Sequence, residues 1–348
     1  MIETYSVSKL KEYSSCPASY RHKYILKTPY RSGSRSTLMG STVHESLEEF
    51  YRGENWLDKP FIDTFTAVSL NSLRTVFNLQ CDSEILLDIH TRLMDLAMCT
   101  DQLHVRASPS YRGEDAIRKG NGEVASKPEI TAAWKKALAE LNIEGTTDRL
   151  NQEMLDINPE LDGLEPVSAF TDAVSLALGY RHPREISSII AVEMPFSAAE
   201  DGILQNPVLM PDNYGGSEGI YFKGYIDLVC EVNGELAILD HKTSKEVVTP
   251  DMVRHNAQLS GYAWAYRKLT GKTVKYIGIN HIRTSQLILQ ECVPAISVES
   301  FRNLAANYTA IKYGLFPKKA PDTEYSSCLK SFGSTCPFLS QCHPHYNN

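Results

Sequence analysis

The stretch "FKGYIDLVCEVNGELAILDHKTSK", residues 222–245, holds two apolar, β-branched and aromatic runs joined by an Asn-Gly pair at 233–234. Asn-Gly between two such runs is the strongest short signal for a β-hairpin. Because side chains alternate along a strand, Asp240 and Lys242 point to one face. Antiparallel pairing about the turn brings Asp227 onto the neighbouring strand. The sequence therefore predicts two carboxylates and an ammonium group close together near a strand end.

This group of side chains has the chemistry of a site for a hard divalent cation. Carboxylate oxygens are the ligands that Mg²⁺ and Mn²⁺ prefer. The lysine would offset their charge and orient a water molecule or a phosphate oxygen, as metal-assisted hydrolysis of a phosphodiester requires. Taken alone, the Asp-x-Lys pattern is a weak signal, because a surface ion pair on an edge strand would look the same.

Residues elsewhere in the chain could join this site. Gln258 and Tyr262 are four residues apart in "QLSGYAWAY" and therefore share one face of an expected helix. His44 lies on the apolar face of another expected helix, "TLMGSTVHESLEEFY" (37–51), where a hydrogen-bonded core histidine is the alternative. Glu193 is at the end of an expected strand, where it either lines the site or faces solvent.

Periodicity divides the chain into a helical part and a strand-rich part. Residues 53–185 contain several runs at helical spacing, and the residues after them contain runs rich in Ile, Val and Tyr that indicate strands. One helix is expected at 249–271, with Thr249 as its N-cap and Gly271 after its end. The order of strand, hairpin, strand, helix, strand and strand, preceded by helices, predicts an α/β fold.

Composition describes an ordinary globular chain of 348 residues, with 42% hydrophobic and 22% charged residues. No apolar run is long enough for a membrane span, and the polar start lacks a signal core, so an intracellular protein is expected. The net charge is −7, but residues 1–36 and the residues from 300 onward each have more Lys and Arg than Asp and Glu. These basic ends are either a phosphate-binding surface or solvated helix faces.

The chain has eight cysteines. Because it lacks a secretion signal, metal binding or burial is expected of them rather than disulfide formation. Cys16 stands before Pro17 near the start, and "CLKSFGSTCPFLSQC" supplies three more, at 328, 336 and 342. Such thiolates can hold zinc or an iron–sulfur cluster. The other four are expected to be small buried side chains: Cys81, Cys99, Cys230 and Cys292.

The ordered set "SVSKLKEYSSCPASYRHKY", "GSTVHESLEEF", "FKGYIDLV", "LAILDHKTSK" and "QLSGYAWAY" resembles the RecB-type branch of the PD-(D/E)xK nuclease superfamily. The resemblance implies a metal-dependent deoxyribonuclease with a restriction-endonuclease-like core, in which helices flank a mixed sheet. It implies that Mg²⁺ or Mn²⁺ is held by His44, Asp227, Asp240 and the backbone carbonyl of His241. Lys242 resembles the catalytic lysine, and Gln258 with Tyr262 resembles the RecB-specific Q-x-x-x-Y pair. The second acid is Asp rather than Glu, which the family allows.

The cysteines near the two ends resemble those of AddB-type and CRISPR-associated RecB-like exonucleases, where four thiolates hold a [4Fe-4S] cluster. This resemblance assigns the cluster to Cys16, Cys328, Cys336 and Cys342, with a four-cysteine zinc site as the alternative. The seven residues between the second and third of these cysteines depart from the family, which usually has two there. A cluster here would join both basic ends beside the active site.

Four segments are expected on this basis. Residues 1–52 would supply N-terminal helices with the first cluster cysteine and the ligand histidine, and residues 53–185 a large helical insert. Residues 186–292 would form the nuclease core, and residues 293–348 the C-terminal cluster segment. A polar loop of the insert is a candidate for contact with a DNA strand through Tyr111, Arg112, Arg118 and Lys119.

The function expected first is an exonuclease that prefers single strands or free DNA ends. The alternative is a partner-dependent DNA-end-binding or processing subunit of a helicase-nuclease or integration complex. The chain has no GxxxxGK[ST] run, so a motor would have to come from another chain, such as a helicase or another recombination protein. A third hypothesis is a structural protein held together by zinc.

Overall fold

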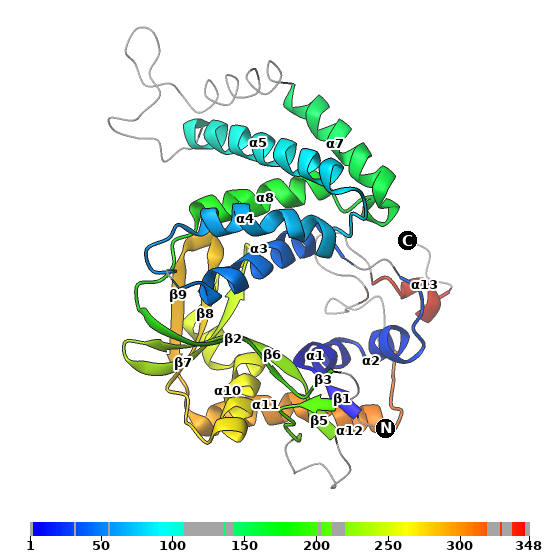
Figure 1. Ribbon diagram of the computed structural model, residues 1–348. Coiled ribbons are helices and arrows are strands. Elements are labelled where there is room, and N and C mark those ends of the chain that lie inside the picture. Colours follow the sequence, from blue (N-terminus) through cyan, green and yellow to red (C-terminus); the bar gives the residue numbers. More distant parts are fainter. Residues whose placement is uncertain are drawn as a thin grey trace.

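A computed structural model describes residues 3–30, 33–54, 56–107, 136, 142–200, 203–210, 220–318, 328 and 336–344. At its centre is a five-stranded mixed sheet in the order β2-β6-β7-β8-β9 (Figure 1). Its strands are β2 (Ile186–Phe196), β6 (Gly224–Val232), β7 (Glu235–Lys242), β8 (Tyr276–His281) and β9 (Gln286–Glu291). Only β7 and β8 pair in parallel within this sheet. The predicted α/β class, with a mixed sheet flanked by helices, is confirmed.

The hairpin between β6 and β7 forms where it was predicted. Asn233 and Gly234 have φ values of 53° and 80°, which are the left-handed values that a two-residue type I′ turn requires. The strands pair from Val232 with Glu235 to Leu228 with Leu239. Continued by one residue, this register sets Asp227 beside the end of β7.

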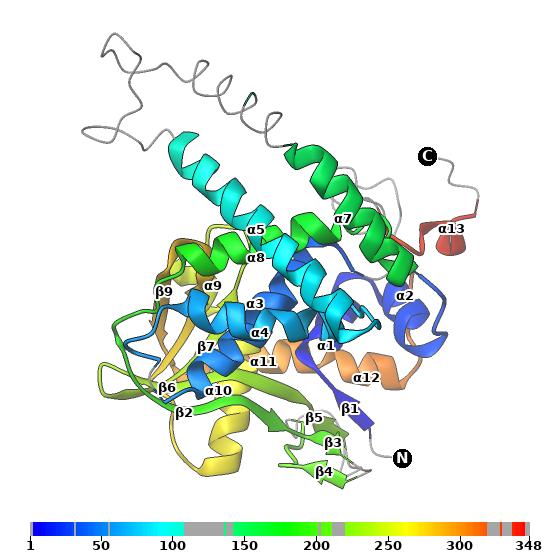
Figure 2. The same ribbon diagram turned by 45° about the horizontal axis from the view of Figure 1, so that its top comes forward.

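Helices cover one face of the sheet in layers. The first layer is α3 (Arg35–Arg52), the next α4 (Phe61–Thr75) with α8 (Pro166–Gly179), and the outermost α5 (Ser83–Ala107) with α7 (Ile143–Ile157). Figures 1 and 2 show this order from two directions. Short 3-10 helices follow α7 (Pro159–Leu161) and β8 (Ile282–Thr284). The apolar core on this side includes Ala237 and Leu239 of β7.

The other face carries helices from the beginning and from the C-terminal third of the chain. They are α1 (Val7–Ser15), α2 (Pro17–Tyr20), α10 (Ala257–Thr270), α11 (Pro294–Ala305) and α12 (Asn307–Lys312), and a π-helix continues α2 (Arg21–Ile25). Ile238 of β7 belongs to the core on this side. Alternation along β7 therefore sends Asp240 toward α10 and His241 toward α3.

The remaining elements lie at the margins. Two short pairs form at one end of the molecule: β1 (Glu3–Tyr5) with β5 (Ile220–Phe222), and β3 (Ala198–Glu200) with β4 (Ile203–Gln205). The C-terminal α13 (Leu339–Cys342) lies near α2 in both ribbon views. Within the described ranges, no helix is long and apolar enough to cross a membrane.

The single helix predicted at 249–271 is wrong, because the segment folds as two helices. Thr249 does cap the first, α9 (Pro250–Arg254), and Gly271 follows the second, α10. Between them, the Asn256 side chain accepts hydrogen bonds from the backbone N–H groups of Gln258 and Leu259 and starts a new helix. A side chain that satisfies these N–H groups competes with continuation of the first helix.

Candidate active site

Three acidic side chains meet on three adjacent strands of the sheet. Pairing of Val192 with Leu228 and of Met194 with Ile226 sets Glu193 of β2 opposite Asp227 of β6. The hairpin register sets Asp227 beside Asp240 of β7. The exposed fractions of these two aspartate side chains are only 12% and 3%.

Burial and mutual repulsion act on the protonation of these acids. Burial raises the pKa of Asp227 well above its usual value, and the nearby Asp240 charge adds to the rise. Burial, followed by the charge of Glu48, raises the pKa of Glu193 to about 7, and Asp240 contributes as well. Glu193 is partly buried and lies within electrostatic range of Asp240, which favours the first of its two predicted positions, lining the site. It adopts a φ of 48°, in the left-handed region that is costly for a non-glycine residue.

Asp240 is the centre of the polar contacts. The Lys242 ammonium forms an ion pair with Asp240 Oδ2 at 2.6 Å, and this buried oxygen accepts no hydrogen bond. Gln258 Nε2 donates to Asp240 Oδ1 at 2.8 Å and to the Tyr262 hydroxyl at 3.1 Å. Burial raises the pKa of Tyr262, so its phenol stays neutral. The structure thus brings the predicted Gln-Tyr pair from α10 onto the predicted Asp-Lys pair of β7.

His44 of α3 approaches from the opposite side. Its Nδ1 lies 3.7 Å from Asp227 Oδ2, and its ring hydrogen-bonds the backbone of His241. Although a third of the side chain is exposed, burial of the ring lowers the pKa of His44. A neutral imidazole is the form that ligates metal ions. The His241 backbone N–H donates to Asp227 Oδ2 at 2.9 Å. The backbone of His241 therefore contacts both His44 and Asp227.

The imidazole of His241 takes part in a buried polar network that the sequence did not predict. Asn280 of β8 lies 3.0 Å from His241 Nδ1 and donates to the Tyr180 hydroxyl at 2.7 Å. The hydroxyls of Tyr180 and Tyr51 lie 2.8 Å apart, and the Tyr51 ring stacks on His241 with 5.5 Å between centroids. This network joins α3, α8, β7 and β8 directly behind the acidic group. Asn280, a polar residue in the Ile-containing strand β8, is a sequence signal that could have indicated it.

Lys11 of α1 is a second residue near the site that sequence reasoning placed only among the basic N-terminal residues. Burial lowers the pKa of Lys11, and the positive charge of Lys242 lowers it further. The negative charge of Asp240 acts in the opposite direction. Two ammonium groups therefore lie within electrostatic range of the same buried carboxylate.

The chemistry of the donor set, though not its spacing in this structure, fits a hard divalent cation. Two buried carboxylates and one neutral imidazole are oxygen and nitrogen donors of the kind that Mg²⁺ and Mn²⁺ accept. Over the part of the chain that the structure describes, no three His, Cys, Asp or Glu side chains converge closely enough to hold a metal ion. The Asp240 oxygens instead face Lys242 and Gln258.

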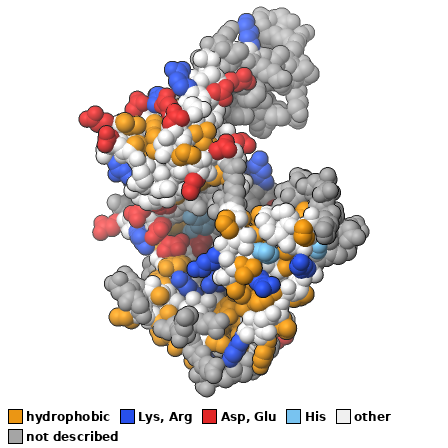
Figure 3. Space-filling model, turned by 90° about the vertical axis from the view of Figure 1, so that its right-hand side faces the viewer, with side chains coloured by type: hydrophobic (Ala, Val, Ile, Leu, Met, Phe, Trp, Pro, Cys, Tyr) orange, Lys and Arg blue, Asp and Glu red, His pale blue; other side chains and the backbone are white. Residues whose placement is uncertain are grey.

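The site opens on a cleft of about 820 Å³, whose lining includes His44, His241 and Lys242. In Figure 3, acidic and histidine side chains lie inside a hollow of the surface, and Lys and Arg side chains follow its lower rim. A negatively charged centre with a basic border suits a phosphate-bearing ligand that brings a cation with it.

Two of the four end cysteines share a buried cluster and the other two lie within electrostatic range, but among the described residues the set is not close enough to hold a metal ion. Cys16 and Cys342 share one small buried cluster with Ala18, and Cys328 is also buried. Burial raises the pKa of Cys342, and Cys16, Cys336 and Cys328 are all near enough to raise it further. The Cys336 backbone N–H donates to the Cys328 carbonyl at 2.8 Å.

The other four cysteines are not all buried to the same degree. Cys230 and Cys292 are buried as expected, whereas Cys81 and Cys99 are only partly buried. The loop residues of the insert that were predicted to contact a DNA strand lie outside the described residues: Tyr111, Arg112, Arg118 and Lys119.

Comparison with known proteins supports a family assignment. A family model described as the PD-(D/E)XK nuclease superfamily matches residues 4–158 and 167–343, which is almost the whole chain. No curated protein matches the chain.

Proposed function

The chain belongs to the PD-(D/E)XK nuclease superfamily, and from that premise we propose that its Asp240-Lys242 site hydrolyses DNA phosphodiester bonds with Mg²⁺ or Mn²⁺. Metal-dependent nuclease activity and a DNA substrate follow from the family. The observation that supports this location is the meeting at Asp240 of an adjacent buried acid, a lysine ammonium and a glutamine amide.

Each side chain has a distinct role in this proposal. Asp227, Asp240 and His44, with the His241 carbonyl, would hold the cation, which when bound polarises the phosphate and acidifies its water. Gln258 fixes one Asp240 oxygen, and Tyr262 fixes the Gln258 amide. Lys242 is 37% exposed, so its ammonium can contact both Asp240 and a phosphate oxygen or water in the cleft.

The proposed mode is exonucleolytic, with a preference for single strands or free ends. It is supported by the charge distribution along the chain, since both ends have an excess of Lys and Arg and the middle is acidic. A strand that enters by its end can bring its phosphates to a recessed site, whereas a strand without ends must be bent into it.

A structural [4Fe-4S] cluster on Cys16, Cys328, Cys336 and Cys342 is proposed as the second cofactor, with zinc as the alternative. The support is the donor set, because four thiols from both ends of the chain lie within electrostatic range of one another. These residues would tie α1 to α13 and keep the basic ends beside the nuclease core. Closing so long a loop restricts the unfolded chain strongly.

The test is cleavage of end-labelled linear and closed circular single-stranded DNA by the purified chain alone, with Mg²⁺ or Mn²⁺. We expect linear DNA to be cut, and Asp240→Asn or Lys242→Ala to lower the rate by at least about 10³, since each removes a contact made to the reacting centre. Asp251→Asn, an 80% exposed acid on α9, is the matched control.

Each outcome bears on a different part of the proposal. Equal cutting of circles and linear strands would contradict the exonuclease mode. Activity that appears only after a helicase or other protein is added would favour the partner-dependent alternative. Absence of cleavage under all these conditions would contradict the proposed activity itself.

A further inference from the structure

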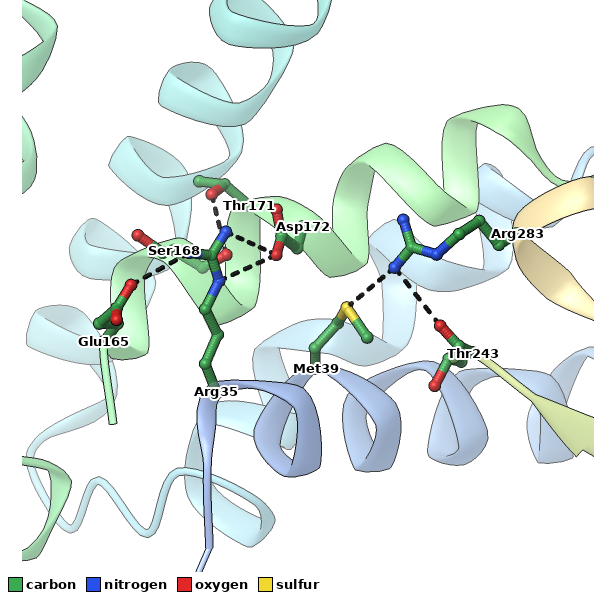
Figure 4. Close-up of polar contacts among 8 residues, drawn as sticks. All are labelled: Arg35, Met39, Glu165, Ser168, Thr171, Asp172, Thr243 and Arg283. Carbon is green, nitrogen blue, oxygen red and sulfur yellow. Dashed lines mark hydrogen bonds and ion pairs between the residues drawn. The ribbon is translucent and has the colours of Figure 1, made fainter. Parts of the chain in front are cut away.

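The cleft beside the proposed active site continues away from the acids. Its walls are the N-terminal half of α3 and the loop that follows β7, from Thr243 to Glu246, and Asp172 of α8 also lines it. Lys242 and His44 lie at the catalytic end. Arg283, in the 3-10 turn after β8, contributes a guanidinium to the same lining (Figure 4).

Arg283 differs from the other arginine of the cleft in its partners. Its Nη2 contacts the Thr243 carbonyl at 3.4 Å and Met39 Sδ at 3.8 Å. Across the described part of the chain, no carboxylate lies within ion-pairing distance of this guanidinium. Arg35, by contrast, is held by Asp172 at 2.7 Å and Glu165 at 3.0 Å (Figure 4). Arg283 is thus the arginine of the cleft with charge and N–H donors available to a ligand.

Buried contacts fix the position of Arg283 relative to Lys242. His281 is 5% exposed, and its ring nitrogens lie 3.0 Å from the Ser244 carbonyl and 2.8 Å from Thr284 Oγ1. This joins the turn of Arg283 to the loop after Lys242. On the other wall, a Cβ at Gly40 would lie only 3.2 Å from Thr243 Oγ1, so α3 packs closely against the same loop.

We propose that this cleft binds the sugar–phosphate backbone of one nucleic-acid strand, with Arg283 on the phosphate next to the scissile one. A guanidinium can form two parallel hydrogen bonds to a phosphate, which an ammonium cannot. The volume of about 820 Å³ lies within the range of roughly 300–1,000 Å³ in which proteins enclose extended small ligands. It suits a short length of one strand.

This assignment rests on the proposed function, because the phosphate at Lys242 is there the one attacked. The experiment measures binding of fluorescein-labelled pentathymidylate to the full chain in EDTA, so that no cleavage is needed. Arg283→Gln is expected to weaken binding about tenfold, the usual loss for one charged hydrogen-bonding contact. It should also reduce the slope of log affinity against log salt by about 0.7, the value for one phosphate of a single strand.

Two further variants complete the design. Arg283→Lys keeps the positive charge but cannot form two parallel hydrogen bonds to a phosphate. It should therefore retain the slope of log affinity against log salt and recover only part of the affinity. Arg254→Gln removes an exposed arginine that bonds Gln290 outside the cleft, and should bind as the unmodified chain does. If Arg283→Gln fails to fold, as judged by thermal unfolding, Arg283→Lys still gives the affinity comparison.

Competitors separate the possible ligands. A blunt hairpin duplex and thymidine monophosphate should each displace the labelled strand at least about tenfold less well than unlabelled pentathymidylate, because each phosphate contact adds to affinity. Equal displacement by the duplex would overturn the single-strand assignment, and equal displacement by the mononucleotide would make this a free-nucleotide site. Unchanged affinity and salt slope in Arg283→Gln would overturn the role of Arg283.

Cleavage by the unmodified chain with Mn²⁺ distinguishes this inference from the proposed function. If that chain cuts DNA and Arg283→Gln binds normally, the cleft assignment fails and the nuclease assignment stands. If it cuts no DNA but Arg283→Gln loses strand binding, the nuclease assignment fails and only the strand-binding role of Arg283 stands.

Discussion

The acidic site and the cysteine group are assembled in opposite ways. Asp227 and Asp240 lie on the two strands of one hairpin, so a two-residue turn is enough to set them side by side. Cys16 and Cys342 come from the two ends of the chain and meet only when the whole fold is complete. The acids repel one another, and a bound cation would reduce this repulsion. The thiols instead connect segments that are distant in the sequence. Changes at the first site should therefore alter chemistry and charge, and changes at the second should alter stability.

The largest effect on stability is expected at the cysteines. Cys16→Ser should lower the free energy of unfolding by about 3–5 kcal/mol, the order found for cross-links that close long loops. The measurement is denaturant unfolding of anaerobically purified protein, with iron content and visible absorbance recorded. Cys81→Ser, a partly buried cysteine outside the group, is the control. Equal stability and equal iron content in Cys16→Ser and Cys81→Ser would contradict a stabilising role for the cysteine group.

An intermediate effect on stability is expected at Glu193, the acid whose pKa is raised to about 7. A carboxyl with a raised pKa holds more protons folded than unfolded, so the free energy of unfolding falls as pH rises from about 4.5 to about 7. Glu193→Gln should remove this loss and stabilise the metal-free protein at pH 8 by about 1–2 kcal/mol after allowance for solvent screening. Stability at pH 4 should be unchanged.

Thermal or denaturant unfolding in EDTA across this pH range checks the prediction. Glu185→Gln changes an exposed glutamate just before β2 and serves as the control. A pH profile identical in Glu193→Gln and the unmodified chain would show that Glu193 is not part of the repelling acidic group.

The smallest effect is expected at the hairpin turn. Gly234 has a φ of 80°, and a methyl group added at its Cα would meet open space, so Gly234→Ala adds only backbone strain, about 1 kcal/mol. Strand pairing fixes the register independently, so cleavage should be retained. Gly179→Ala, which also meets open space but at an ordinary φ, is the control for unfolding measurements. Loss of cleavage together with stability would show that the turn alone holds the acids in register.

The fold was predictable where local patterns specify it. Asn233-Gly234 between two apolar runs predicted the hairpin, and Thr249 and Gly271 were placed correctly at the two ends of the segment that holds α9 and α10. The break between α9 and α10 was missed, because a continuous helical pattern does not show when Asn256 will cap a new helix.

The site was predictable only in part, for a geometric reason. Asp240 with Lys242 and Gln258 with Tyr262 are pairs at strand or helix spacing, so each pair could be identified separately. Their meeting depends on how α10 packs on β7, which the sequence pattern does not specify.

The amino-acid pattern alone was enough to predict the α/β class and the hairpin that pairs Asp227 with Asp240, and it proposed candidate ligands for a hard cation. These follow from alternation, turn chemistry and donor type, which act over a few residues. The folded structure was needed to show that Glu193 lies near Asp240, that Asn280 with two tyrosines supports His241, and that Arg283 faces the cleft without a carboxylate partner among the described residues. Those contacts join segments far apart in the chain, and their geometry depends on the packing of helices against the sheet.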